Sequence, residues 1–177
     1  MLPGRGFAGS TLAVAVGFFL AQSCAILFPD HTAPKSSSYQ VTPPGAPWHK
    51  LAVGDDPSAT DAMKADMAYE NPETGAIISL NSICRKYNKL PLETLTENLV
   101  RGVGDRKIIE RKEIELGGAK GLDTTFEGVV DGVFLHLRTV VAIQDDCTYD
   151  FIHVSVPKRE VGHPHAFDDF LASFHTK

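Results

Sequence analysis

The chain has 177 residues, of which 43% are hydrophobic and 22% are charged, and its formal net charge is −5. This composition is typical of a globular domain and excludes collagen-like, coiled-coil and wholly disordered chains. Because the 17 basic residues are outnumbered by 22 acidic ones, no excess of positive charge is available to bind phosphates, and we expect no nucleic-acid partner.

The first 23 residues predict a secretory signal peptide. No charged residue lies between Arg5 and Asp30, and an apolar run over residues 7–21 is followed by small residues up to Cys24. A positive start, an apolar run and small residues before a cleavage site are typical of such signals.

Residues 20–24 read LAQSC and resemble a bacterial lipobox, the motif in which a cysteine is lipidated and becomes the first mature residue. The resemblance implies a palmitate-type anchor on Cys24, and the uncharged Ala25 after it implies the periplasmic face of the outer membrane. Two alternatives stay open. Ordinary cleavage after small residues would give a soluble periplasmic protein, and an uncleaved segment would give an inner-membrane anchor, because the uncharged stretch is long enough to span a bilayer.

Residues 24–47 predict a lipid-anchored flexible tether. Five prolines and a serine run lie between residues 29 and 47 and leave no apolar period. We expect one folded domain over residues 48–177, with the only tryptophan, Trp48, at one edge of its core.

The domain begins with two predicted strands, over residues 67–70 and 76–81, separated by turn residues. Pro91 then opens a predicted helix, in which leucines and a valine form one apolar stripe. The residues of this stripe are Leu92, Leu95, Leu99 and Val103.

Residues 107–156 predict a four-stranded meander, because apolar residues recur at every second position. The turns are expected at Gly117-Gly118, Asp131-Gly132 and Asp145-Asp146. We attribute most of the aspartates in this region, Asp123 and Asp150 included, to turn chemistry. A helix is predicted to end the chain, with a stripe made by Phe167, Phe170, Leu171 and Phe174.

This order of elements predicts an α+β fold with an antiparallel sheet flanked by helices. The strand over residues 133–143 carries apolar side chains on both faces, which predicts one helix on each face and therefore an α/β/α sandwich.

The order and several short motifs resemble the photosystem-II oxygen-evolving-complex P protein (PsbP) and the nuclear-transport factor Mog1, which share this sandwich. More closely, the chain resembles uncharacterised bacterial lipoproteins of that type. The resemblance covers about residues 48–175 and carries over no catalytic residue, since known members of the fold act as assembly or binding proteins. The motifs are Tyr69-Glu70-Asn71, Gly75-Ala76-Ile77-Ile78, the leucine helix after Pro91, Gly128-x-x-Asp131-Gly132, Cys147-x-Tyr149-Asp150-Phe151 and the phenylalanine helix.

Two further cysteines, Cys84 and Cys147, are expected to form a disulfide, because the predicted compartment is oxidising. Two buried free thiols are the alternative. Cys84 follows one predicted strand and Cys147 precedes another, so the two side chains could meet.

One group of polar residues is a candidate ligand site. His136 and Arg138 share a strand face, and His153 could lie beside them on the next strand, forming either a polar patch or a site for an anionic ligand. His163-Pro164-His165 has no further ligand at a recognised spacing, so we expect a surface loop and no metal. We also expect no catalytic residues and no cofactor, because no nucleophile or dinucleotide motif is present.

The sequence therefore predicts a non-catalytic, membrane-tethered lipoprotein of the bacterial cell envelope. It would act as a protein-interaction or assembly/transport accessory module with a protein partner in the envelope. The alternative is a carrier that binds a small apolar or lipid ligand between a helix and the sheet, which requires a pocket of about 300 Å³ or more. A third possibility, a hydrolase with an unrecognised site, requires a polar cluster with perturbed ionisation.

Overall fold

The computed structural model describes residues 35, 38–53, 65–84, 90–157 and 165–177. The predicted signal peptide, Cys24 and the first part of the predicted tether lie outside the described residues, as does His163. No helix among the described residues is long and apolar enough to cross a membrane.

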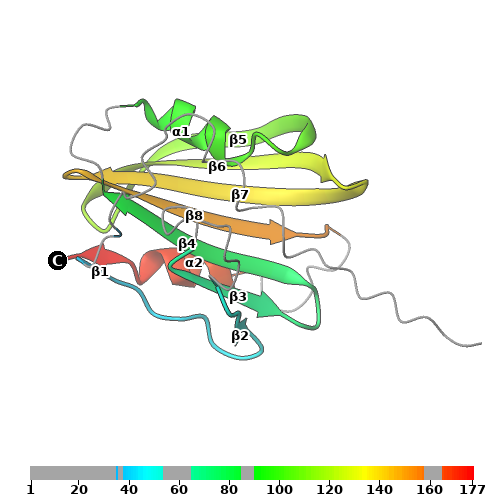
Figure 1. Ribbon diagram of the computed structural model, residues 1–177, viewed down its shortest axis with the longest axis horizontal. Coiled ribbons are helices and arrows are strands. Elements are labelled where there is room, and N and C mark those ends of the chain that lie inside the picture. Colours follow the sequence, from blue (N-terminus) through cyan, green and yellow to red (C-terminus); the bar gives the residue numbers. More distant parts are fainter. Residues whose placement is uncertain (1–34, 36–37, 54–64, 85–89, 158–164) are drawn as a thin grey trace, which may run out of the picture.

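Seven strands form one antiparallel sheet in the order β2-β3-β4-β8-β7-β6-β5 (Figure 1). The strands are β2 (His49–Lys50), β3 (Met67–Asn71), β4 (Ala76–Cys84), β5 (Gly104–Leu116), β6 (Ala119–Val130), β7 (Val133–Gln144) and β8 (Cys147–Ser155). The helices are α1 (Leu92–Leu99) and α2 (Ala166–Ala172). A separate two-stranded sheet pairs β1 (Tyr39–Gln40) with β9 (His175–Thr176).

The predicted hairpin turns are confirmed by their backbone conformations. Asp131 and Gly132 between β6 and β7 both have positive φ, at 50° and 79°. This conformation suits a two-residue hairpin, since aspartate and glycine tolerate it best. Asp145, between β7 and β8, has a φ of 53°, and Gly117, between β5 and β6, has a φ of 58°.

The helices cover opposite faces of the sheet, so the predicted sandwich is confirmed. Neighbouring residues of a strand point to opposite faces, and we name these the α1 face and the α2 face. The α2-face core joins α2 to β3, β4, β7 and β8, and its largest fully buried members include Ile78, Phe151 and Phe170. The smaller α1-face core contains Val100, Phe126 and Leu137.

Helix α1 is shorter than the predicted apolar stripe, and it buries the leucines of that stripe less completely than expected. It ends at Leu99, so Val103 lies beyond it, and the leucines of the predicted stripe are only half-buried. The fully buried side chain of α1 is Thr96. The spacing of the leucines identifies which face of the helix points toward the sheet. It does not tell how closely the sheet approaches, so it could not predict how deeply each leucine is buried.

The folded domain begins earlier than the expected boundary at residue 48. Strand β1 lies within the predicted tether, and Tyr39 and Val41 pack against the α2-face core, as does Trp48. Helix α2 does not end the chain as predicted, because β9 follows it and pairs with β1. Strands β1 and β9 have two residues each, too few for an alternating pattern in the sequence, and they come from opposite ends of the chain.

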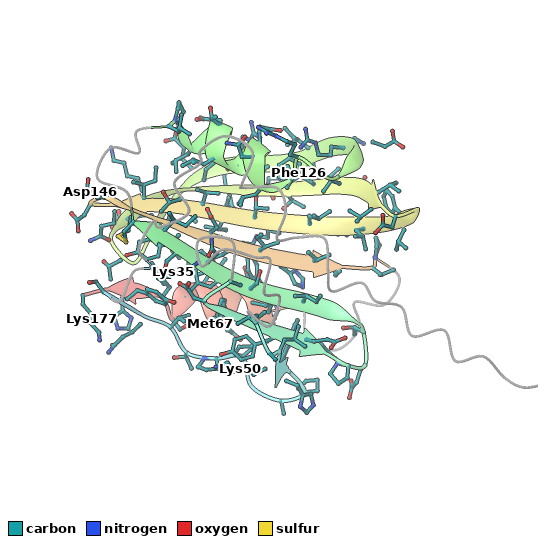
Figure 2. The ribbon with its side chains drawn as sticks, viewed as in Figure 1. Lys35, Lys50, Met67, Phe126, Asp146 and Lys177 are labelled. Atoms are coloured by element: carbon teal, nitrogen blue, oxygen red, sulfur yellow. A yellow bond between two sulfur atoms is a disulfide. The ribbon has the colours of Figure 1, made fainter. Side chains whose placement is uncertain are left out.

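The sheet has two distinct ends. We call one the disulfide end; it holds β1, β9, the β5–β6 and β7–β8 turns and the Cys84–Cys147 bond. The other, which we call the distal end, holds the Asp131-Gly132 turn and the β3–β4 turn (Figures 1 and 2).

Candidate functional site

The predicted polar group lies on the α2 face, at the N-terminal end of α2. Arg138 on β7 is the register partner of His153 on β8, and His136 lies two residues before Arg138 on the same face of β7. The structure therefore brings the three predicted residues onto adjacent strands. Their role in binding an anionic ligand stays a prediction.

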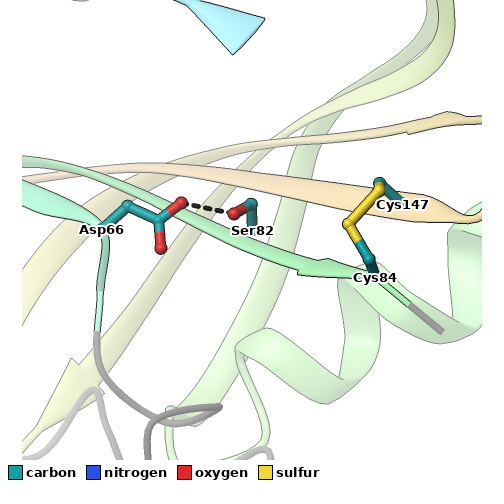
Figure 3. The surroundings of a disulfide bond; sticks show 4 residues. All are labelled: Asp66, Ser82, Cys84 and Cys147. Atoms are coloured by element: carbon teal, nitrogen blue, oxygen red, sulfur yellow. Dashed lines mark hydrogen bonds between the residues drawn. A yellow bond between two sulfur atoms is a disulfide. The ribbon is translucent and has the colours of Figure 1, made fainter. Parts of the chain in front are cut away.

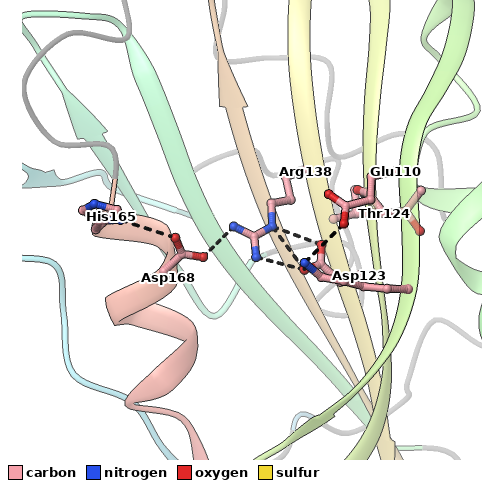
Figure 4. Close-up of polar contacts among 8 residues, drawn as sticks. Glu110, Asp123, Thr124, Arg138, His165 and Asp168 are labelled. Atoms are coloured by element: carbon pink, nitrogen blue, oxygen red, sulfur yellow. Dashed lines mark hydrogen bonds and ion pairs between the residues drawn. The ribbon is translucent and has the colours of Figure 1, made fainter.

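Arg138 is held by two carboxylates that the sequence analysis did not connect with it (Figure 4). Its Nε donates to both oxygens of Asp123 at 3.0 and 3.3 Å, and its Nη2 donates to Asp123 Oδ2 at 2.9 Å. Its Nη1 donates to Asp168 Oδ1, from α2, at 2.6 Å. Hydrogen bonds to Asp123 and Asp168 raise the pKa of Arg138 further above its usual value, although its burial opposes this.

Asp123 lies inside β6 and its side chain is only 4% exposed, so its role is ion pairing and not turn chemistry. A buried carboxylate requires a partner, because removing it from water is costly. Lys112 on β5 adds a second cation, with Nζ 3.7 Å from Asp123 Oδ2. These ion pairs connect β5, β6, β7 and α2 in turn. They attach the helix to the half of the sheet that β5, β6 and β7 form.

His153 is stacked on Phe167 and lies near the tilted ring of Trp48. Its ring lies 5.3 Å from that of Phe167, at an interplanar angle of 23°, and 6.4 Å from that of Trp48. The guanidinium carbon of Arg138 lies 5.3 Å from the Phe167 ring centroid. Phe167 therefore contacts two of the predicted site residues and fixes the start of α2 over them.

His136 belongs to a neighbouring pair nearer the distal end. Its Nε2 lies 3.1 Å from Oε1 of Glu127 on β6, and its ring meets that of Phe134 edge-on with centroids 6.2 Å apart. Both His136 and Glu127 are partly exposed. This pair is therefore accessible from the surface.

A second polar group lies on the α1 face and escaped the sequence analysis. Asn81 on β4 is the register partner of Asp150 on β8, and Asp66 precedes β3 next to them. Asp150 is almost fully buried, and this burial raises its pKa to about 7. A hydrogen bond with Asn81 and the charge of Lys35 lower that pKa, whereas the charge of Asp66 raises it.

Asp66 accepts hydrogen bonds from two hydroxyl groups. Its Oδ2 accepts hydrogen bonds from Ser82 on β4 (Figure 3) and from Tyr39 on β1, the latter at 2.9 Å. Burial, with a further contribution from Asp66, raises the pKa of Tyr39 above its usual value. The sequence offered one signal for Asp150, the alternation of side chains along a strand, because Asp150 occupies a core-facing position in a strand of apolar residues.

The described part of the chain has an open groove of about 590 Å³ beside β1. It lies between β1, the start of β3 and the end of α2. Its lining is partly polar and partly apolar, and comprises Tyr39, Gln40, Val41, Thr42, Met67, Ser173 and His175.

The expected disulfide joins Cys84 to Cys147, which are register partners on β4 and β8 (Figure 3). No group of three or more metal-binding side chains gathers within the described ranges. His165 is exposed at the start of α2, with Nδ1 3.8 Å from Asp168 Oδ2.

No model of a protein family matches the chain, and no curated protein matches its sequence. Among solved structures, LpqN of Mycobacterium tuberculosis, a protein involved in cell envelope biogenesis, is similar with a TM-score of 0.56 at 12% identity. The match covers 83% of this chain and 88% of LpqN. The cyanobacterial PsbP (CyanoP) of Synechocystis matches with a TM-score of 0.54 at 13% identity, over 80% of this chain and 94% of CyanoP.

The fold is PsbP/Mog1-like. A Bacteroides thetaiotaomicron protein also matches, with a TM-score of 0.51 at 9% identity, over 79% of this chain and 48% of that one. At identities this low the likeness shows the PsbP-like fold alone, and function has to be argued from the residues.

Proposed function

We propose that this protein is a non-catalytic accessory module of the bacterial cell envelope. A lipid on Cys24 tethers it to the membrane, on the periplasmic face of the outer membrane. Its folded domain binds a protein partner through the distal end of the sheet. The envelope role of LpqN, which shares the fold, supports the proposed setting.

One observation carries the proposal: the large apolar side chains that are exposed among the described residues lie in the distal half of the sheet. Val133 and Phe134 open β7 there and are 41% and 50% exposed. Ile108 and Ile109 lie in the distal half of edge strand β5 and are 45% and 48% exposed. Because neighbouring residues of a strand point to opposite faces, Val133 and Phe134 offer apolar contacts on both faces of the distal hairpin. Exposed apolar side chains are often buried in protein-interaction surfaces, where water is readily displaced from them.

The position of this surface suits a tethered protein. The N-terminal segment joins the domain at the disulfide end, where β1 pairs with β9. The apolar side chains lie at the other end of β5, β6 and β7. A tether from Cys24 therefore leaves the distal end free to contact a partner.

The lipid is tested by feeding cells an alkyne-bearing fatty acid and measuring label on the full-length protein. Cys24→Ser should lose the label, whereas the matched neighbour variant Ser23→Ala should keep it. Absence of label on the wild-type protein would refute the lipid anchor.

The partner is tested by affinity capture of the tagged protein from detergent-solubilised envelopes. The double variant Ile109→Ser/Phe134→Ser should lose a protein that the wild type retains. The control Glu115→Ser/Lys120→Ser changes two exposed residues near the disulfide end and should retain it. Equal capture by both double variants would refute the distal surface.

A second candidate, the carrier of a small apolar ligand, is favoured by the groove beside β1. Its volume of about 590 Å³ is sufficient for a short acyl chain. Native mass spectrometry of the purified protein should then show a bound lipid that Met67→Asp removes. A wild-type protein that carries no added mass would exclude this candidate.

A further inference from the structure

The N-terminal strap, defined as Lys35 and residues 38–42, is fastened to the domain at two places. At one, β1 pairs with β9, and the amide of Thr42 donates to Ser173 Oγ at 2.9 Å. At the other, Lys35 Nζ lies 3.4 Å from Asp66 Oδ1 and donates to the side-chain oxygen of Asn81. Lys35 is therefore bound to the body of the sheet, although it is distant in sequence.

Asn81 connects Lys35 to a buried charge. Its side-chain oxygen accepts from Lys35, and its side chain also hydrogen-bonds Asp150, its partner across the strands. Asp66 precedes β3 beside the same residues. The charge of Lys35 therefore acts on two carboxylates, Asp66 before β3 and the buried Asp150 on β8.

The strap is also held by aromatic packing. Tyr39 meets Tyr149 edge-on at 5.7 Å and lies 5.8 Å from Phe174, while its hydroxyl donates to Asp66. This packing does not depend on pH in the neutral range. Lys35 forms an ion pair with Asp66 and donates to the amide of Asn81, and its charge also acts on the buried Asp150, so its docking depends on the charge of these carboxylates.

We propose that Lys35 is a pH-sensitive clasp, which holds the N-terminal strap closed when Asp150 is ionised and loosens it when Asp150 takes up a proton. The groups that act on Asp150 are Lys35 from the strap, Asp66 before β3 and Asn81 from β4. Its neighbour on β7 is the apolar Val141.

The sign of the effect follows from linkage. Burial raises the pKa of Asp150 to about 7, and the charge of Lys35 lowers it toward that value. If Lys35 leaves, the pKa rises further, so docking of Lys35 releases a proton from Asp150. Docking is therefore tighter above neutral pH and weaker as the pH falls below about 7.

The consequence for reach rests on the proposed lipid at Cys24. From Cys24 to Lys35 there are eleven residues, which span at most about 40 Å when fully extended. If release of Lys35 frees the chain as far as Ser38, just before β1, the span becomes at most about 50 Å. The clasp would therefore set how far the distal end extends from the membrane.

Hydrogen–deuterium exchange of the full-length protein in detergent tests the clasp, with exchange corrected for the intrinsic effect of pH. The protection factor of peptides covering residues 38–42 should fall about fivefold between pH 8 and pH 6, as expected when Lys35 loses its attraction to one buried charge. A peptide from β7 serves as the internal reference for global unfolding.

Variants separate the clasp from a general loss of stability. Lys35→Gln should lower strap protection at every pH and remove its pH dependence, whereas Lys50→Gln, an exposed lysine of β2, should behave as wild type. Asp150→Asn should give low protection at every pH, whereas Asp146→Asn, in the exposed β7–β8 turn, should not.

Wild-type protection that does not change with pH, or a Lys35→Gln variant that matches wild type, would overturn the clasp. This readout does not depend on lipidation. Failure of the fatty-acid labelling would instead overturn the proposed anchor and leave the exchange result standing.

Discussion

Arg138 on β7 and Asp123 on β6 form a two-pronged ion pair, with Nε and Nη2 of the arginine 3.0 and 2.9 Å from the two carboxylate oxygens. The carboxylate is buried, while the arginine is partly exposed and also reaches Asp168 of α2. The pair therefore joins the sheet to the helix that covers one face of it.

Replacing Arg138 by methionine should lower the free energy of unfolding by about 3 kcal/mol, because Asp123 is left buried beside Lys112 alone. Urea denaturation measures the change. Arg101→Met removes an exposed arginine that bonds only Asn98 among the contacts described and should cost less than about 0.5 kcal/mol. Equal losses in the two variants would show that the Asp123 pair is not structural.

Removing the disulfide with Cys84→Ser/Cys147→Ser should cost about 4 kcal/mol, because the bond closes a long loop in the unfolded chain. Guanidinium unfolding without reductant measures this cost. Wild-type protein treated with reductant should unfold at the same midpoint as the variant. Two reactive thiols from Cys84 and Cys147 in the unfolded, unreduced wild type would show that the bond is absent.

Asp150 should make the protein less stable as the pH rises from about 4 to about 7. The pKa of Asp150 is about 7 in the folded protein, above its value of 3.8 in the unfolded chain. The stabilisation that Asp150 contributes is therefore fully present below its unfolded pKa and is lost as the pH rises through its folded pKa. The difference in unfolding free energy between wild type and Asp150→Asn should change by about 4 kcal/mol across this range. Asp146→Asn provides the control, and a flat difference would refute the shifted pKa.

Gly117 should not tolerate a side chain. A Cβ there would lie 2.6 Å from the carbonyl oxygen of Phe174, and the residue has a positive φ. Gly75 shares the positive φ but has open space around it. Gly117→Ala should therefore lose about 2 kcal/mol more than Gly75→Ala in thermal unfolding, and an equal loss would mean that β9 does not pack closely on this turn.

The sequence predicted the elements whose signals are local. Asp131-Gly132 and Asp145 marked two hairpin turns because those residue types tolerate positive φ. The spacing of Phe167 and Phe170 placed the buried face of α2. Apolar side chains on both faces of β7 predicted a helix on each side of the sheet.

The features that the sequence did not predict depend on contacts between distant residues. Strand β1 pairs with the C-terminus, and two residues are too few for a periodic pattern. Asp150 and Asp123 were attributed to turn chemistry, although alternation along β8 already places Asp150 on a core-facing side; the register of β6, β7 and β8 shows which strands surround them. Their partners, Lys35 and Arg138, come from other elements.

The most direct test of the account is site-specific photo-crosslinking in living cells, because its central claim is a partner-binding surface at the distal end. A photoreactive phenylalanine analogue is placed at position 134 or, as a control, at exposed position 115 near the disulfide end. The account predicts a crosslink to one envelope protein from position 134 and none from position 115. Crosslinking of the same protein only from position 115, or no crosslink from position 134, would contradict it.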